Sequence, residues 1–132
     1  MDMKKLTKKL TKKHIKRQCD NYASLIARSK GYCEVCGNVF NQLQAHHVIS
    51  RNNHRLRWDL KNLCCLCSSC HKFSNTSAHQ NPVAFLNWFK QVRPDDYDYL
   101  NDSKWNQTKV LRLNDYQEIY NNLKEIYEKI NN

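Results

Sequence analysis

"AHHVISRNNHRLRWDLKNLCCLCSSCHKF", residues 45–73, gathers two adjacent histidines, three arginines and four cysteines, and it ends on Cys-x-x-Cys-His. The segment lacks a helical period, and residues 43–49 and 62–67 are typical of two short strands. Ser68 or Ser69 is placed to cap the exposed N–H groups of a short helix that follows. The stretch therefore predicts two strands and a helical turn.

The cysteines predict what holds these elements together. Cys33/Cys36 and Cys67/Cys70 are two Cys-x-x-Cys pairs, a spacing typical of a structural Zn²⁺ with four thiolate ligands. Cys64 and Cys67 have the same spacing, so a second register is open; the pair 67/70 is preferred because a helix is expected to begin there. A site closed by four thiolates leaves no position for water or substrate, so this ion should stabilise rather than catalyse.

Three further cysteines, Cys19, Cys64 and Cys65, are then expected to be buried apolar thiols. Disulfides or a redox-active pair are the alternatives. The chain has no run of about 18 apolar residues and no apolar segment behind its basic N-terminus, so we expect neither a membrane span nor a secretory signal. A cytoplasmic location, in a bacterial or phage-infected cell, favours metal ligands over disulfides.

Charge is unevenly distributed over the 132 residues, which are enough for one domain. Residues 1–93 hold 17 of the 22 Lys and Arg and only four acids, whereas residues 95–132 hold eight acids and five bases. Such a basic field is expected to attract a polyanion such as nucleic acid, in a salt-dependent way. The alternative is a basic solvated face that keeps the protein soluble.

Apolar residues at three- and four-residue intervals predict helices at residues 14–30 and 115–130, and Asn81-Pro82 predicts the start of another that runs to Val92. Asn114 and Gln117 are placed as a variant capping box for the last helix. We expect a basic tail at 1–13, a core at 14–93 and a helical extension at 94–132 that packs on the core.

The histidines and one asparagine carry a resemblance to a known family. His46-His47, Asn62 fifteen residues later, and His71 directly after Cys70 resemble the His-Asn-His (HNH) endonuclease motif, in the subset braced by a four-cysteine zinc. A weaker similarity, in "YCEVCG", "LRW" and the next Cys-x-x-Cys, extends to phage NinG-type recombination proteins. The resemblance implies an α+β fold: a small ββα-metal core braced by Zn(Cys)₄, with flanking N-terminal and C-terminal helices.

The resemblance also implies a role for each residue. His46 and His71 would bind a catalytic divalent cation, with Asn75, one helical turn after His71, as a third ligand. His47 would be the general base, and Asn62 would hold the loop between the strands and orient that base. Availability favours Mg²⁺ or Mn²⁺, while imidazole ligands also accept Ni²⁺, Co²⁺ or Zn²⁺.

Physical reasoning fits these roles. Adjacent residues on a strand point to opposite sides, so one ring of the His46-His47 pair can face a metal and the other an attacking water. His71, one residue past Cys70, is rotated by about 100° on a helix and so points away from the zinc. Four cations between the strands are candidate phosphate ligands: Arg51, Arg55, Arg57 and Lys61. His54 is expected on the surface, and His14 and His79 fit no pattern.

The function predicted from the sequence is a metal-dependent endonuclease that hydrolyses DNA phosphodiester bonds with low sequence specificity and is encoded by a phage or mobile element. By family implication its products carry 5′-phosphate and 3′-hydroxyl ends. One alternative is a noncatalytic, zinc-stabilised nucleic-acid-binding protein. Another is a protein-interaction module that uses the acidic C-terminal helix. The preferred DNA structure and the oligomeric state stay open.

Overall fold

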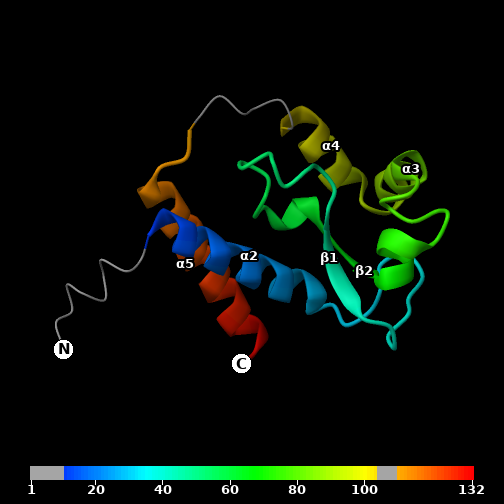
Figure 1. Cartoon of the computed structure of the whole chain (residues 1–132), viewed down its shortest axis with the longest axis horizontal. Helices are drawn as coiled ribbons and strands as arrows, with labels where there is room; N and C mark the ends of the chain where they lie inside the picture. Colours follow the sequence, from blue (N-terminus) through cyan, green and yellow to red (C-terminus); the bar gives the residue numbers. More distant parts are fainter. Residues whose placement is uncertain (1–10, 104–109) are drawn as a thin grey trace.

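The computed structural model describes residues 11–103 and 110–132 (Figure 1). The elements, in chain order, are α2 (Lys12–Arg28), β1 (Leu43–His47), the 3₁₀ turn η1 (Leu60–Asn62), β2 (Leu63–Cys67), the wide turn η2 (Ser69–Phe73), α3 (Pro82–Val92), α4 (Pro94–Ser103) and α5 (Leu113–Ile130). The predicted α+β fold is confirmed. Most of the predicted basic tail, residues 1–10, lies outside the described residues.

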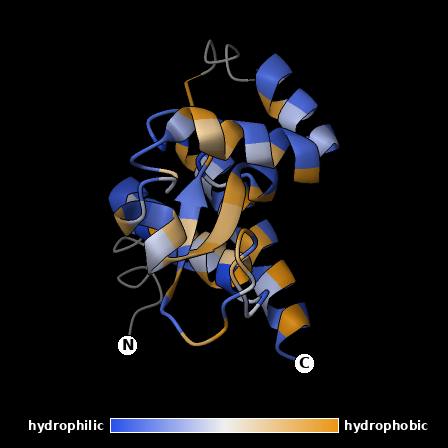
Figure 2. Cartoon of the chain, turned by 90° about the vertical axis from the view of Figure 1, so that its right-hand side faces the viewer, coloured by the Kyte–Doolittle hydropathy of each residue, from blue (hydrophilic) through white to orange (hydrophobic). Residues whose placement is uncertain are grey.

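The two strands form an antiparallel pair in the middle of the molecule. His46 lies opposite Cys64, and His47 lies opposite Leu63. Every residue of β2 is buried, and the strand is hydrophobic along its length (Figure 2). Because opposed residues share a face of the sheet, the two histidines project to different sides.

One side of the sheet is covered by α2 and α5, which cross each other (Figure 1). The side chains buried between them and the sheet are Ile15, Cys19, Ala23, Ile26, Trp58, Leu63, Tyr116 and Leu123. Their spacing on α2 is the three- and four-residue pattern that predicted this helix. The Cys19 thiol donates to the Tyr116 carbonyl at 3.8 Å, so the two helices are joined by a polar contact as well as by apolar packing.

The other side is covered by α3 and α4. Phe85 and Phe89 of α3 and Leu100 of α4 are buried in one cluster with Cys64 and Leu66 of β2. The predicted start of α3 is confirmed, because the Asn81 side chain accepts the Ala84 N–H at 3.1 Å. The sequence analysis did not predict α4, which opens on a proline followed by two acids, a favourable start for a helix.

The predicted cap of the C-terminal helix is wrong. Helix α5 begins at Leu113, and the Asp115 carboxylate accepts the Arg112 N–H at 2.8 Å. Because the helix starts two residues earlier than expected, Asp115 occupies the third helical position, and Asn114 and Gln117 do not form the box. No helix within the described ranges combines the length and apolarity that a membrane span needs.

We predict that the α2–α5 contact contributes strongly to stability. Leu123→Ala removes a side chain that is 2% exposed, so it should lower the free energy of unfolding by about 2–5 kcal/mol. Leu113→Ala, on the same helix at 49% exposure, is the matched control and should cost less than about 1 kcal/mol. Urea denaturation of the two variants measures both values; equal losses would contradict the packing described above.

Candidate metal centre and active site

Four cysteines from two distant segments meet at one point. The Sγ atoms of Cys33, Cys36, Cys67 and Cys70 all lie within 4.8 Å of one another. This confirms the 67/70 register. Cys64 is fully buried elsewhere, where its sulfur accepts a contact from Arg93 Nη1 at 3.4 Å.

Backbone geometry shapes both cysteine pairs. The chain turns back after Cys36 at Gly37, whose φ of 77° is disfavoured for residues with a side chain. The Gly37 N–H donates to the Cys33 carbonyl at 2.8 Å, and the Cys70 N–H donates to Cys67 Sγ at 3.5 Å. These contacts place the four sulfurs around a common centre.

The thiols of Cys33 and Cys70 in the cluster have shifted pKa values. Burial opposes ionisation of Cys33, but nearby backbone N–H groups outweigh it and lower its pKa to about 7. Burial, together with the Cys67 and Cys36 thiols, raises the pKa of Cys70. Four thiolates at this spacing repel one another unless a positive ion lies between them, as in a structural zinc site.

The remaining cysteines behave as predicted. Cys19, Cys64 and Cys65 are buried and free. Burial raises the pKa of Cys19 to about 11 and that of Cys64 to about 12. They are therefore packing residues rather than reactive thiols.

The turn η2 connects the cysteine cluster to a group of histidines. It begins at Ser69, within the predicted range, and is closed by a hydrogen bond from Ser74 N–H to the Ser69 carbonyl at 2.9 Å. The Ser68 hydroxyl makes no capping bond, so that part of the prediction is wrong. Cys70 and His71 are consecutive in this turn, and the His71 ring lies in a second cluster.

That second cluster consists of His46, His71 and His79, each offering a ring nitrogen within 4.8 Å of the others. The Nε2 atoms of His71 and His79 are 3.0 Å apart. The His46 ring meets the His71 ring edge-on, with centroids 5.0 Å apart. Three imidazoles around one point form a donor set suited to a divalent transition metal, with positions left for water or a phosphate oxygen.

His79 was missed by the sequence analysis. Backbone bonds bring it to the cluster: the Ala78 N–H donates to the Cys70 carbonyl at 2.8 Å, and the His79 N–H donates to the His71 carbonyl at 3.1 Å. A separation of eight residues matches neither a helix nor a strand period. The one signal in the sequence was its place just before the Asn81-Pro82 helix start, where the chain returns toward the core.

Asn75, predicted as the third ligand, is placed differently. The turn η2 ends at Phe73 and Ser74 is extended, so the helix on which Asn75 would follow His71 by one turn does not exist. Asn75 is exposed and is not among the residues that line the histidine cavity, whereas His79 is.

The ring of His71 is oriented by a polar neighbour. The oxygen of the Gln44 side chain accepts from His71 Nδ1 at 2.6 Å, which puts the proton on Nδ1 and leaves a lone pair on Nε2. Desolvation lowers the pKa of His71 to about 4 and that of His46 to about 3, with the neighbouring histidines adding to the shift. Both rings are therefore neutral at physiological pH, the form that binds metals.

His47 lines the same cavity, of about 480 Å³, although its backbone position faces the α2 side of the sheet. Its Nε2 lies 2.9 Å from the Arg57 carbonyl, which can only accept, so Nε2 carries the proton and Nδ1 has the free lone pair. Desolvation lowers the pKa of His47 and outweighs the hydrogen bond to the Arg57 carbonyl, which raises it; Arg51 adds a smaller lowering effect. A neutral imidazole with one nitrogen committed to a carbonyl is suited to accept a proton.

Asn62 is fully buried and holds the loop between the strands. Its side-chain oxygen accepts the Ile49 N–H at 2.7 Å, and its amide donates to the carbonyls of Ile49 and Leu56 at 3.0 Å each. These bonds fix both ends of a loop that also carries the Arg57 carbonyl. The hydrogen bonds of the Asn62 side chain thus go to the loop and not to the His47 ring.

Comparison with models of known protein families gives a match over part of the chain. Residues 33–76 match the family model of the HNH endonuclease. This segment is similar to an HNH endonuclease domain, and it is called the HNH domain below. It contains both cysteine pairs, His46, His47, Asn62 and His71, while His79 lies just beyond it. Comparison with curated proteins and comparison with solved structures gave no significant match.

The four predicted phosphate ligands of the HNH domain have different surroundings. Arg51 lines the histidine cavity. The Arg57 guanidinium donates two hydrogen bonds to the Asp20 carboxylate of α2, from Nε to Oδ1 at 2.9 Å and from Nη2 to Oδ2 at 2.6 Å. The Lys61 ammonium lies over the Tyr99 ring at 4.4 Å, and Arg55 is exposed beside α5. Of the four, only Arg51 faces the histidine cavity.

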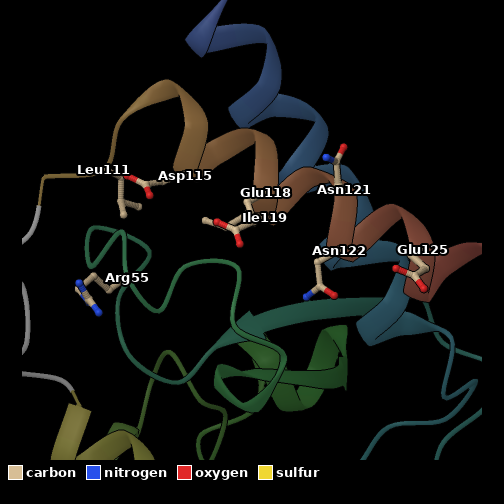
Figure 3. A pocket seen from close by; sticks show the side chains of 8 residues that line it. All are labelled: Arg55, Leu111, Asp115, Glu118, Ile119, Asn121, Asn122 and Glu125. Atoms are coloured by element: carbon tan, nitrogen blue, oxygen red, sulfur yellow. The ribbon is translucent and has the colours of Figure 1, made fainter.

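A second cavity, of about 540 Å³, lies between α5 and the strand-connecting loop of the HNH domain (Figure 3). Figure 3 shows Asp115, Glu118 and Glu125 along α5, with Arg55 across from them. The lining contains no histidine or cysteine. Its carboxylates repel phosphate, so this larger cavity does not suit a nucleic-acid substrate.

We predict that the cysteine cluster is required for metal retention and folding of the HNH domain. Cys67→Ser should abolish the structural zinc and lower the melting temperature by about 10 °C or more, because binding energy at such sites is folding energy. Zinc content by elemental mass spectrometry and thermal unfolding by circular dichroism measure the two effects. Cys65→Ala, which changes a buried cysteine outside the cluster, should keep the zinc content of the parent. An unchanged zinc content in Cys67→Ser would contradict the assignment.

Proposed function

We propose that this chain is a metal-dependent endonuclease that hydrolyses DNA phosphodiester bonds. The observation that carries the proposal is the arrangement in one cavity of three imidazoles around a common point and a fourth, His47, with a free Nδ1 lone pair. The match to the HNH endonuclease model supports the same chemistry.

His46, His71 and His79 would hold the divalent cation. A cation held by these residues would supply positive charge to a phosphate oxygen and to the departing 3′-oxygen. Three imidazoles without a carboxylate favour Mn²⁺, Co²⁺, Ni²⁺ or Zn²⁺ over Mg²⁺, which prefers oxygen ligands. Gln44 supports this role because it keeps the His71 proton on Nδ1 and away from the cluster.

His47 acts as the general base. A water positioned at Nδ1 gives up its proton to that nitrogen as its oxygen attacks phosphorus, while Nε2–H stays bonded to the Arg57 carbonyl. His46 and His47 are adjacent on β1 and project to different sides of the sheet. The attacking water and the leaving oxygen can therefore lie on opposite sides of the phosphorus, and the products carry 5′-phosphate and 3′-hydroxyl ends.

Cationic groups beside the cavity bind the substrate. Arg51 and Lys72 line it and are suited to contact the scissile phosphate or its neighbour. The loop also borders a separate, basic cavity, distinct from the acidic cavity of Figure 3. It is lined by Lys12, Lys16, Asn52, His54, Arg55, Val110, Leu111 and Tyr116, with no acid among them. We place the adjoining DNA backbone along this loop, an interaction that should weaken steeply with salt.

The proposal includes low sequence specificity and a phage or mobile-element origin. The contacts named above would fall on phosphates, which position a nuclease on DNA without reading its bases. The origin rests on the similarity to phage NinG-type proteins alone.

We predict that His47→Ala abolishes cleavage and spares binding. Loss of a general base should slow nicking of supercoiled plasmid by about 10²–10⁴-fold in the presence of Mn²⁺ or Mg²⁺. Gel electrophoresis measures the rate, with EDTA as the metal-free control, and fluorescence anisotropy with labelled DNA measures the affinity. The affinity of His47→Ala should stay within about twofold of the parent value, because the ring carries no charge.

Two outcomes would count against the enzyme. Equal nicking by His47→Ala would exclude this histidine as the base. Salt-sensitive binding without nicking under Mg²⁺, Mn²⁺, Co²⁺, Ni²⁺ and Zn²⁺ would support the alternative, a noncatalytic zinc-stabilised nucleic-acid-binding protein.

We predict that His79, rather than Asn75, completes the catalytic metal site. His79→Ala should weaken the affinity for Mn²⁺ or Co²⁺ by at least about 100-fold. Removing a residue that only orients a metal ligand costs up to about 100-fold, and removing a direct ligand should cost at least as much. Calorimetric titration of zinc-loaded protein measures this affinity. Asn75→Ala and His14→Ala change an exposed amide and a histidine outside the cluster, so both variants should bind the ion as the parent does. A loss of metal affinity in Asn75→Ala but not in His79→Ala would support Asn75 as the ligand instead.

A further inference from the structure

Asp20, on α2 and outside the segment that matches the HNH model, accepts bonds from two consecutive residues of the strand-connecting loop. Arg57 donates through Nε to Oδ1 at 2.9 Å and through Nη2 to Oδ2 at 2.6 Å. The Trp58 indole donates to Oδ1 at 2.8 Å. Both carboxylate oxygens are thus used in a forked ion pair, which fixes direction as well as distance.

The same two loop residues enclose the peptide group that contacts the proposed base. The carbonyl of Arg57 accepts from His47 Nε2 at 2.9 Å. The Arg57 side chain, which precedes this carbonyl, is 15% exposed and is paired with Asp20. The Trp58 side chain, which follows it, is 4% exposed and is buried between α2 and α5. Holding both flanking side chains restricts the rotation of this carbonyl.

We propose that Asp20 is a positioning residue for His47: through Arg57 and Trp58 it fixes the carbonyl that keeps the imidazole proton on Nε2 and the lone pair on Nδ1. The inference rests on the proposed role of His47 as general base. It makes α2 a functional part of the nuclease rather than a packing element.

The charge state of Asp20 agrees with this role. Burial favours its neutral form, but the hydrogen bonds from Arg57 and Trp58 outweigh that effect and lower its pKa. Arg51, 3.5 Å from Oδ2 and 60% exposed, is the outermost of its cationic partners. The carboxylate is therefore ionised at neutral pH and binds the loop as a charged acceptor.

The test compares Asp20→Asn with the parent. The asparagine is close in size but has one acceptor oxygen, and its NH₂ group faces the guanidinium donors, so the fork is lost. We expect kcat for plasmid nicking to fall by about 10–100-fold, the usual effect of an outer-shell partner, with KM, zinc content and Mn²⁺ affinity unchanged.

The tautomer of His47 provides a readout independent of activity. In ¹⁵N-histidine-labelled protein in slightly alkaline buffer, the two ring nitrogens give distinct shifts, and the parent should show His47 protonated at Nε2. Asp20→Asn should show a mixture of Nε2–H and Nδ1–H forms. If the parent did not nick DNA at all, the proposed function would fail, while this spectrum would still test the positioning.

Asp96→Asn is the matched control. Asp96 accepts from Arg93 Nε at 2.8 Å, and Arg93 donates to the carbonyls of Leu63 and Lys61 rather than contacting the loop peptide at Arg57. This variant should retain both the rate and the His47 spectrum. A loss of rate in Asp20→Asn without a change of tautomer, or an unchanged rate and spectrum, would overturn the proposal.

If Asp20→Asn fails to fold, Arg57→Lys tests the same link. It keeps the backbone carbonyl and the positive charge but removes the fork. It should reproduce the mixed tautomer and the lower kcat; the parent tautomer in a folded Arg57→Lys protein would overturn the proposal.

Discussion

The four-thiolate cage is the constraint on which the rest of the structure depends. Cys67 is the last residue of β2, Cys70 lies in the turn that follows, and both meet a pair that begins 34 residues before Cys67. Because four thiolates at this spacing would need a cation between them, a bound ion would fix where the strand ends and how the turn leaves it. His71 follows Cys70 directly, so the same constraint that closes the fold also directs an imidazole toward His46.

The local parts of this arrangement could be predicted from the sequence. The expected helix start after Cys67 favoured the 67/70 register, the lack of a helical period indicated the strands, and Asn81-Pro82 identified the start of α3. Each of these depends on residues near one another in the chain. His79 could not be predicted, since it reaches the cluster through backbone bonds to the turn at Cys70 and His71. The family resemblance implied Asn75, one helical turn after His71, but η2 ends at Phe73 and does not carry that period forward.

The elements outside the matched segment have their own part in the site. Trp58 and Leu63 of the HNH domain are buried against α2 and α5, so the loop that contacts His47 is packed on helices that the family model does not include. The position of Arg57 in the loop between the strands predicts a phosphate ligand. Its pairing with Asp20 shows why charge alone cannot assign such a role: a neighbour distant in sequence decides whether a guanidinium is available.

The pairing of α2 with α5 also has a consequence for how the chain assembles. Cys19 and Tyr116 are 97 positions apart, whereas the sulfurs of Cys36 and Cys67 are separated by 31. Ordering a longer loop costs more entropy, and contacts of large sequence separation form late. We therefore expect the four-cysteine cluster to fold first around its ion, and α2 and α5 to pack on it last. The supply of metal during synthesis would then determine the yield of folded protein.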